Sequence, residues 1–242
     1  VMFENLLKTA RLEVHHLLSP CAFEDAPRVL LLGGSNFDLR LKRSFLDTVL
    51  TKQCHVATYE PRGIGRTEQP SGDWTMQDYA LDALAMLDAL GWQDAHIVGE
   101  SFGGMTALHV ALVALERVRS LTISSATAGG AKHASYDISQ FLKLPREDAA
   151  KQAMALQDTR NTALQETDPR TFEAALKQRQ KFERQFADPS ISSGGYARLL
   201  SARAGHDCVA DLERINVPVT VICGRYDLQA RPESQQALVA AL

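Results

Sequence analysis

Short apolar segments alternate with longer amphipathic ones along most of this chain, and this alternation limits its possible folds more than any other feature. Runs that are apolar throughout are typical of strands covered on both faces, as in parallel sheets flanked by helices. The expected fold class is therefore α/β, with a mostly parallel, doubly wound sheet. Six segments are predicted as strands: residues 11–17, 28–32, 53–59, 95–99, 119–124 and 217–223.

Helical periodicity is clearest in residues 75–90, where apolar side chains recur at helix-like spacing. Gly91 follows this segment, and glycine is a common residue at the end of a helix. Residues 102–115 and 232–242 are also predicted as helices. The second of these has Pro232 in its first turn, a position that tolerates proline.

The alternation breaks in residues 129–205, where charged and Gln-rich segments predict three or four helices and no strand. We expect a helical cap inserted here, with residues 1–128 and 206–242 forming the α/β core. Within the cap, residues 171–186 carry an amphipathic pattern that suits either ordinary packing on the core or a cover over a pocket. The apolar face of this pattern contains Phe172, Ala175, Leu176, Arg179, Phe182 and Phe186.

Composition excludes several classes of protein. The 242 residues are 45% hydrophobic and 23% charged, as in ordinary globular domains, and 26 Lys and Arg against 29 Asp and Glu leave a net charge of −3. This balance argues against nucleic-acid and anionic-membrane partners. The longest nearly apolar stretch, residues 107–115, is shorter than the ~20 residues that a membrane helix needs.

The four cysteines are far apart and include no Cys-x-x-Cys pair. This spacing predicts neither a zinc site nor a disulfide framework. We therefore expect the thiols to be reduced and the protein to be cytoplasmic.

A Gly-x-Ser-x-Gly pattern follows the predicted strand 95–99 and leads directly into a predicted helix. It reads Gly99-Glu100-Ser101-Phe102-Gly103. A serine in such a strand-turn-helix context is held in a strained backbone conformation that presents its Oγ above the sheet edge, and the flanking glycines leave room for the turn. We therefore predict that Ser101 is a nucleophile; the alternative is a glycine-rich strand end with an incidental serine.

A second glycine-rich loop follows the predicted strand 28–32 and reads Gly33-Gly34-Ser35-Asn36. A tetrahedral intermediate needs two N–H donors, one from the residue after the nucleophile and one from an early strand–helix loop. The backbone N–H groups of Phe102 and Ser35 are the predicted oxyanion hole, with Gly34 as a neighbouring choice for the second donor. The alternative is a plain connecting turn.

A third loop, residues 59–67, also contains two glycines. No Lys-Ser or Lys-Thr follows them, so a phosphate-binding P-loop is rejected. We expect a structural turn in which Arg62 is an internal tether rather than a substrate clamp.

With these motifs in place, the sequence resembles the α/β-hydrolase superfamily, in particular its small esterases and enol-lactonase-like members. The resemblance runs from about Arg28 to the end and includes the segment 217–227, which ends in Arg225-Tyr226-Asp227. It implies an eight-stranded sheet, a cap after the sixth strand, Ser101 as nucleophile and Asp227 as the triad acid.

Three positions depart from the pattern of that superfamily. Gly33 stands where histidine is usual, Glu60 replaces the usual aspartate, and Thr67 replaces the usual serine. The backbone donors of the oxyanion hole remain available with Gly33. The open question is whether the loop is rigid with glycine at position 33.

The general base that Ser101 needs is not evident from the sequence, because the superfamily order is Ser, then Asp, then His, and no histidine follows Asp227. We expect the triad histidine and a last strand to come after Leu242. The existing histidines are expected to be structural or exposed, with His206 in a capping or surface position. They are His15, His16, His55, His96, His109, His133 and His206.

The resulting hypothesis is a serine hydrolase of carboxylic esters, lactones or thioesters that works through an acyl-enzyme, with no metal ion or organic cofactor. Two alternatives stay open: a catalytically silent small-molecule-binding protein on the same scaffold, and a haloperoxidase-like or C–C-bond hydrolase with the same triad. The expected partner is a small apolar acyl substrate. The cap residues predicted to form a lipophilic wall are Phe141, Leu142, Phe182, Phe186 and Tyr196.

Overall fold

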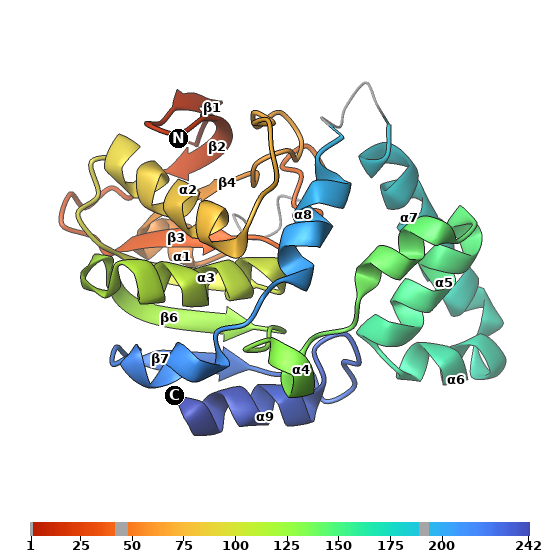
Figure 1. The fold of residues 1–242 in the computed structure, drawn as a ribbon. Coiled ribbons are helices and arrows are strands. Elements are labelled where there is room, and N and C mark those ends of the chain that lie inside the picture. Colours follow the sequence, from red (N-terminus) through yellow and green to blue (C-terminus); the bar gives the residue numbers. More distant parts are fainter. Residues whose placement is uncertain (1, 42–47, 189–193) are drawn as a thin grey trace.

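The computed structural model describes residues 2–41, 48–188 and 194–242, in which one seven-stranded sheet carries helices on both faces (Figure 1). The spatial order of the strands is β1-β2-β4-β3-β5-β6-β7. Their bounds are β1 Phe3–Lys8, β2 Glu13–Ser19, β3 Arg28–Leu32, β4 His55–Tyr59, β5 Ala95–Glu100, β6 Val118–Ser124 and β7 Val219–Ile222.

The sheet is mostly parallel, which confirms the predicted fold class. Strands β4, β3, β5, β6 and β7 run parallel to one another, whereas β1 and β2 form an antiparallel pair and β2 joins β4 antiparallel. Strand β1 was not predicted from the sequence. It lies at the sheet edge and most of its residues are exposed, so it lacks the continuous apolar run that marks the central strands.

The three helices predicted in the core are present as α2 Met76–Ala89, α3 Phe102–Val113 and α9 Pro232–Ala241. Three short elements were not predicted: α1 Leu50–Gln53 and the 3-10 turns η2 Leu115–Arg117 and η4 Val209–Arg214. Helix α2 begins at a reciprocal capping box between Thr75 and Asp78 and is followed by Gly91, whose φ of 68° suits glycine. Helices α2 and α3 lie side by side over one face of the sheet (Figure 1).

Alternate residues of the central strands divide between two apolar clusters, as expected for a sheet covered on both faces. In β3, Leu30 and Leu32 belong to the large cluster that includes α2 and α3. Val29 and Leu31 belong to a smaller cluster with Phe37 on the other face.

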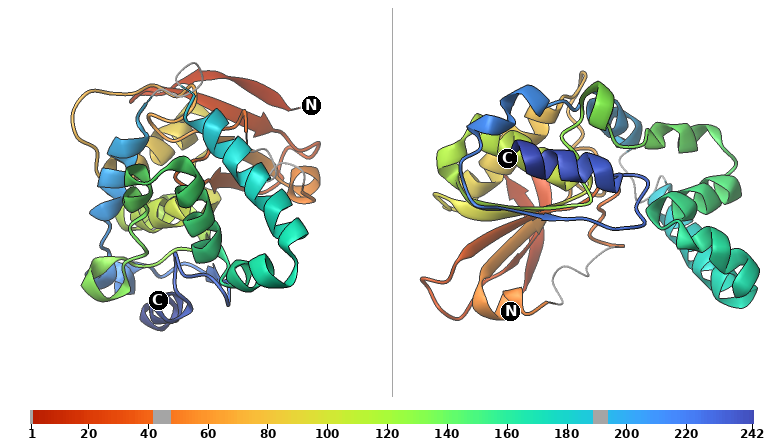
Figure 2. Two further views of the ribbon diagram at one scale, coloured as in Figure 1. Left: turned by 90° about the vertical axis from the view of Figure 1, so that its right-hand side faces the viewer. Right: turned by 90° about the horizontal axis from the view of Figure 1, so that it is seen from below.

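Residues 129–205 form helices and no named strand in the part that the structure describes, as predicted, but the described part has five α-helices and one 3-10 helix rather than three or four helices. The elements are α4 Gly130–His133, η3 Ile138–Lys143, α5 Arg146–Gln157, α6 Arg160–Thr167, α7 Pro169–Phe186 and α8 Tyr196–Ala204. Helices α5, α6 and α7 stand beyond the end of the sheet (Figures 1 and 2). They have a small apolar cluster of their own, formed by Ala150, Met154, Phe172 and Leu176.

Helix α8 packs on the core through Leu199 and Leu200, which belong to the large core cluster, as do Ile138 of η3 and Phe186 of α7. The division into a core of residues 1–128 and 206–242 and a cap of residues 129–205 stays a prediction.

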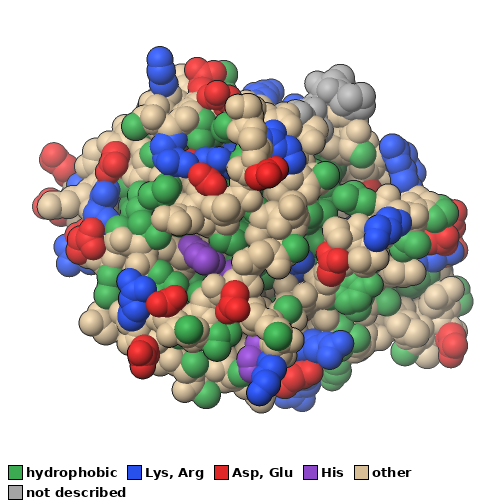
Figure 3. Space-filling view, in the orientation of Figure 1, with side chains coloured by type: hydrophobic (Ala, Val, Ile, Leu, Met, Phe, Trp, Pro, Cys, Tyr) green, Lys and Arg blue, Asp and Glu red, His purple; other side chains and the backbone are tan. Residues whose placement is uncertain are grey.

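On the face shown in Figure 3, basic and acidic side chains are interspersed. None of the helices in the described ranges combines the length and apolar character needed to cross a bilayer.

Candidate active site

Ser101 lies in the sharp turn between β5 and α3, as predicted. Its backbone has φ 53° and ψ −115°, a strained conformation for a residue other than glycine. The turn is crowded: a Cβ on Gly99 would overlap the carbonyl oxygen of Gly103, and a Cβ on Gly103 would overlap that of Leu32. Both glycines are therefore required by close backbone approach.

The backbone around Ser101 is tied into both elements that it joins. Its N–H donates to the carbonyl of Ser124 at 2.8 Å, and its carbonyl accepts from the N–H groups of Gly104 and Met105 at 2.9 and 3.1 Å. Phe102 is the first residue of α3, so its N–H has no acceptor within the helix. This end of α3 thus offers an N–H group and the positive end of the helix dipole beside the Ser101 side chain.

Ser101 lines a cavity of about 240 Å³ between the sheet and the cap. Ser35 and Asp227 contribute to the same cavity from the core, and Phe141 and Tyr196 from the cap. The structure thus brings together three of the four residues predicted for the site, although they come from distant parts of the sequence. The fourth, Phe102, is buried directly behind Ser101.

The loop after β3 approaches Ser101 closely. A Cβ placed on Gly34 would lie 3.7 Å from the Cβ of Ser101. Gly33 has no space for a side chain, because the ring of Phe37 occupies that position, and the N–H of Phe37 donates to the carbonyl of Gly34 at 3.1 Å. Phe37 therefore supports the loop from below, which answers the question of rigidity that Gly33 raised.

Tyr196 connects the cap to this loop. A side-chain hydrogen bond with Ser35 acts to lower the pKa of Tyr196, but burial has the larger effect and raises it above its ordinary value. The Tyr196 hydroxyl is therefore neutral and can donate a hydrogen bond near the predicted oxyanion hole.

Asp227 lies beyond the end of β7 and is buried. Its Oδ1 accepts the N–H groups of Gln229 and Ala230 at 2.8 and 3.0 Å. Burial raises the pKa of Asp227, and these two N–H groups together with the Ser125 side chain offset part of that rise. The carboxylate is thus held in one orientation at the wall of the cavity.

The loop that carries Asp227 is also held by the cap. The N–H of Leu228 donates to the carbonyl of Leu156 at 2.8 Å, and the N–H of Thr159 donates to that of Tyr226 at 3.0 Å. A third backbone bond runs from Tyr136 to Gln229 at 2.8 Å. The position of the carboxylate therefore depends on the cap as well as on the sheet.

Glu60 joins two loops beneath the site. Its carboxylate accepts the N–H groups of Leu39 at 2.9 Å and Arg66 at 2.6 Å, and it lies 3.0 Å from Nδ1 of His15. Thr67 donates its hydroxyl to the carbonyl of Glu60 at 2.8 Å. Two of the departures from the superfamily pattern therefore support the local structure.

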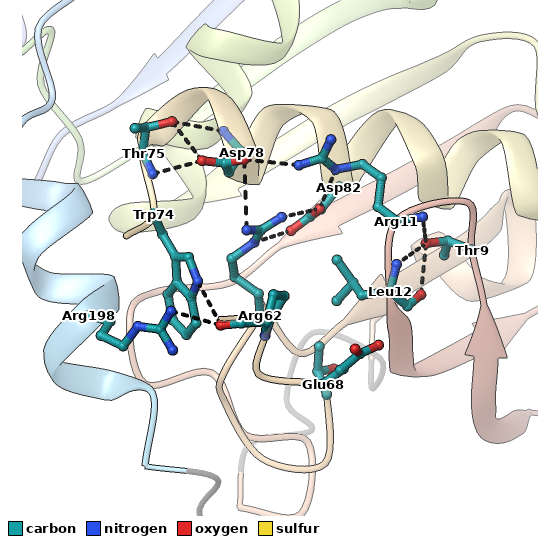
Figure 4. Close-up of polar contacts among 12 residues, drawn as sticks. Thr9, Arg11, Leu12, Arg62, Glu68, Trp74, Thr75, Asp78, Asp82 and Arg198 are labelled. Atoms are coloured by element: carbon teal, nitrogen blue, oxygen red, sulfur yellow. Dashed lines mark hydrogen bonds and ion pairs between the residues drawn. The ribbon is translucent and has the colours of Figure 1, made fainter. Parts of the chain in front are cut away.

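Arg62 is an internal tether, as predicted, and does not line the cavity (Figure 4). Its guanidinium binds the carboxylate of Asp82 through two bonds of 2.6 and 2.7 Å, and Arg11 binds the same carboxylate at 2.8 Å. The Arg62 guanidinium also lies 5.9 Å from the ring centroid of Trp74 and 5.7 Å from that of Tyr79. This cluster fixes the loop on which the start of α8 rests.

No histidine in the described part of the chain lines the cavity. The prediction of a capping or surface position for His206 is wrong, because this side chain is buried. Its Nδ1 lies 3.0 Å from Nε2 of His109, and its Nε2 lies 2.8 Å from the carbonyl oxygen of Thr127. Burial lowers the pKa of His206 to about 4, so the ring is neutral at pH 7.

Several cavity residues were not predicted from the sequence: Asn36, Glu100, Ser125, Gln157, Arg179 and Gln229. Ser125 has a φ of 50°, and the only sequence signal for it was its place after a predicted strand. Arg179 had a stronger signal, because it is the charged residue among the six named for the amphipathic face of residues 171–186.

The predicted lipophilic wall is partly wrong. Phe141 and Tyr196 line the cavity, but Leu142, Phe182 and Phe186 do not, and Leu142 is exposed. Most of the remaining lining is polar.

Comparison with known proteins agrees with this geometry. The family model described as alpha/beta hydrolase fold matches residues 27–242. A Pseudomonas syringae pv. syringae (strain B728a) protein with the provisional name carbamate hydrolase RutD is 28% identical over 236 residues, covering 94% of this chain and 86% of the relative. 3-Oxoadipate enol-lactonase 1 of Acinetobacter baylyi (strain ATCC 33305 / BD413 / ADP1) is 29% identical over 215 residues, covering 84% of this chain and 73% of the relative.

A solved structure supports the fold. The enol-lactonase from Burkholderia xenovorans LB400 superposes with a TM-score of 0.78 at 22% identity, covering 98% of this chain and 87% of that one. The strained serine turn, the sheet order and the matched family model together show that the chain belongs to the α/β-hydrolase family and is an enzyme of the hydrolase type.

Proposed function

We propose that this hydrolase is a serine hydrolase that cleaves a carboxylic ester, lactone or thioester through an acyl-enzyme. One observation carries the proposal: Ser101, in a strained turn at the start of α3, lines the same cavity as the buried carboxylate of Asp227. Strain at a serine that also faces a cavity is typical of a nucleophile elbow. Relatives named as an enol-lactonase and a methylesterase support the acyl class of substrate.

In the proposed reaction, Ser101 Oγ attacks the acyl carbon and the carbonyl oxygen becomes an oxyanion. The N–H groups of Phe102 and Ser35 donate to that oxyanion; Phe102 adds the positive end of the α3 dipole, and Gly34 lets the loop approach. The alcohol or thiol leaves, and water then cleaves the acyl-enzyme to release the acid.

A neutral serine hydroxyl needs a base. We assign to Asp227 the role of accepting the N–H of an imidazole and fixing its orientation, so that the other ring nitrogen takes the proton from Ser101. The location of that histidine after Leu242 stays a prediction. Burial raises the pKa of Asp227, and an imidazolium beside the carboxylate would lower it again by stabilising the charged form.

A fluorophosphonate probe tests this proposal on the full natural chain. We expect covalent labelling of the wild-type protein and no labelling of Ser101→Ala. Ser71→Ala is the matched control, because Ser71 is exposed and lies outside the cavity, and it should label as the wild type does. A folded natural chain that takes up no probe, or a Ser101→Ala variant that still takes it up, would contradict the assignment.

A further inference from the structure

Arg179 stands on the mostly apolar face of α7, one turn before Glu183. Its neighbours on that face, Phe172, Leu176 and Phe186, are buried. The Arg179 side chain is 20% exposed. Arginine is rarely placed in such surroundings unless its charge is paired or used, so its position calls for a reason.

Two contacts fix the direction of the Arg179 guanidinium. Its Nε donates to Glu183, one turn further along α7, at 2.6 Å, and its Nη1 donates to Gln157 of α5 at 2.9 Å. A guanidinium has five N–H donors, so among the described residues these bonds leave donors for a ligand. Arg179 and Gln157 both line the cavity, whereas Glu183 does not.

The charges that line the cavity are separated. Glu100 and Asp227 supply negative charge at the end of the sheet, beside Ser101. Arg179 is the one cation among the described lining residues, and it belongs to the cap. An elongated substrate with one anionic end is therefore attracted by the cap and repelled by the carboxylates beside Ser101, which orients its neutral end toward the nucleophile.

We infer that the cavity takes small esters or lactones whose acyl chain ends in a carboxylate, with Arg179 holding that carboxylate while Ser101 attacks the carbonyl at the other end. This inference rests on the proposed function. The planar guanidinium fork matches a carboxylate in shape and hydrogen-bonding pattern. Ile138 and Phe141 provide apolar contact for the chain between the two ends, and a volume of about 240 Å³ restricts the substrate to a small molecule.

The reaction is balanced as a hydrolysis. The bond between the acyl carbon and the ester oxygen breaks, and that oxygen leaves with a proton as the alcohol. The hydroxyl of water adds to the acyl carbon. The product of a half-ester is then a dicarboxylate, with one carboxylate at Arg179 and the new one at Ser101.

A pair of matched esters tests the inference on the full natural chain: monomethyl adipate, which carries a terminal carboxylate, and methyl hexanoate, which does not. We expect kcat/KM to favour the half-ester at least about tenfold in the wild type. In Arg179→Gln, kcat/KM for the half-ester should fall about 10- to 100-fold more than that for the neutral ester, mostly through KM. Arg179→Lys should retain part of the preference.

Arg184→Gln is the matched control, because Arg184 is an exposed arginine of the same helix and lies outside the cavity. It should keep the wild-type ratio of the two esters. A wild type without preference for the half-ester, or an Arg179→Gln variant that loses both activities equally, would overturn the inference while the proposed function stands.

A binding measurement separates this inference from the proposed function. Calorimetric titration of Ser101→Ala with monomethyl adipate should show binding that weakens at least tenfold in Ser101→Ala/Arg179→Gln. If the wild type cleaves neither ester, the proposed function fails and this titration still decides the inference. Equal affinity in the two variants would refute it.

Discussion

The guanidinium carbon of Arg198 lies 3.9 Å from the ring centroid of Trp74, so the start of α8 is stacked on a loop of the core. The same guanidinium donates to the carbonyl of Pro70 at 2.7 Å and to that of Gly72. The N–H of Gly195 adds a bond of 3.1 Å to the carbonyl of Gly63. These contacts hold the helix that carries Tyr196 over the predicted oxyanion loop.

Loss of this stacking should loosen the cap and reduce turnover. We expect Arg198→Ala to lower the free energy of unfolding by about 1–2 kcal/mol, because one cation–π contact and charged hydrogen bonds are removed. It should lower kcat more than it raises KM, because Tyr196 moves relative to Ser35. Chemical denaturation and steady-state kinetics measure both effects. Lys181→Ala, an exposed change on α7, is the control, and an equal loss in that variant would contradict a specific role for Arg198.

Disrupting the ion pair of Arg62 and Asp82 should lower the free energy of unfolding more than disrupting an exposed ion pair. The reason is that Asp82 is 1% exposed and accepts bonds from both Arg62 and Arg11. Asp82→Asn leaves the buried Arg62 cation with a single carboxylate partner, Asp78, at the longer distance of 3.8 Å. We expect a loss of about 3–5 kcal/mol in the free energy of unfolding, measured in urea. Asp88→Asn removes a carboxylate that is 63% exposed and pairs with Arg117, and it should cost far less. Similar losses in the free energy of unfolding of Asp82→Asn and Asp88→Asn would show that burial does not determine how much the Arg62–Asp82 pair contributes to stability.

His206 should make the folded state sensitive to acid. Its pKa is lowered from 6.5 to about 4 in the folded protein, so between these pH values the unfolded chain binds more protons. The free energy of unfolding therefore falls as pH drops from 6.5 toward 4, by about 3 kcal/mol from this residue. Burial also lowers the pKa of His109, which acts in the same direction.

The variant His206→Gln tests this dependence through urea unfolding at a series of pH values. The slope between pH 6.5 and 4 should become shallower in His206→Gln. It should not change in His133→Gln, which alters a partly exposed histidine on α4. An unaltered slope in His206→Gln would assign the acid sensitivity to other groups.

The crowding around Ser101 predicts that Gly103→Ala is poorly tolerated. The added methyl group would overlap the carbonyl of Leu32, which is backbone and cannot rotate away. We expect a loss of about 3 kcal/mol in the free energy of unfolding and a fall in kcat as the turn shifts. Gly205→Ala is the control, because its Cβ would meet nothing closer than 3.5 Å. A fully active and stable Gly103→Ala variant would show that the turn has room to adjust.

The turn around Ser101 was accessible from the sequence because its geometry is local. Glycines on both sides of a serine between a strand and a helix determine the turn, whatever the rest of the chain does. Asp227 was predicted from the resemblance to the α/β-hydrolase superfamily, and it lies at the same cavity as Ser101 because the carboxyl ends of parallel strands meet at one edge of a sheet. The same local reasoning predicted that Arg62 is a tether.

The other side of the cavity depends on how the cap docks on the sheet. Arg179 and Gln157 reach the cavity only after helices distant in sequence pack together, and no local pattern specifies that packing. His206 was misplaced for the same reason, since its burial against His109 joins residues 97 positions apart. The periodicity of helices and strands, and the need for glycine in a tight turn, depend on a few neighbouring residues. These features can therefore be predicted from the sequence. Charge orientation and burial arise from contacts between distant segments and appear only in the folded chain.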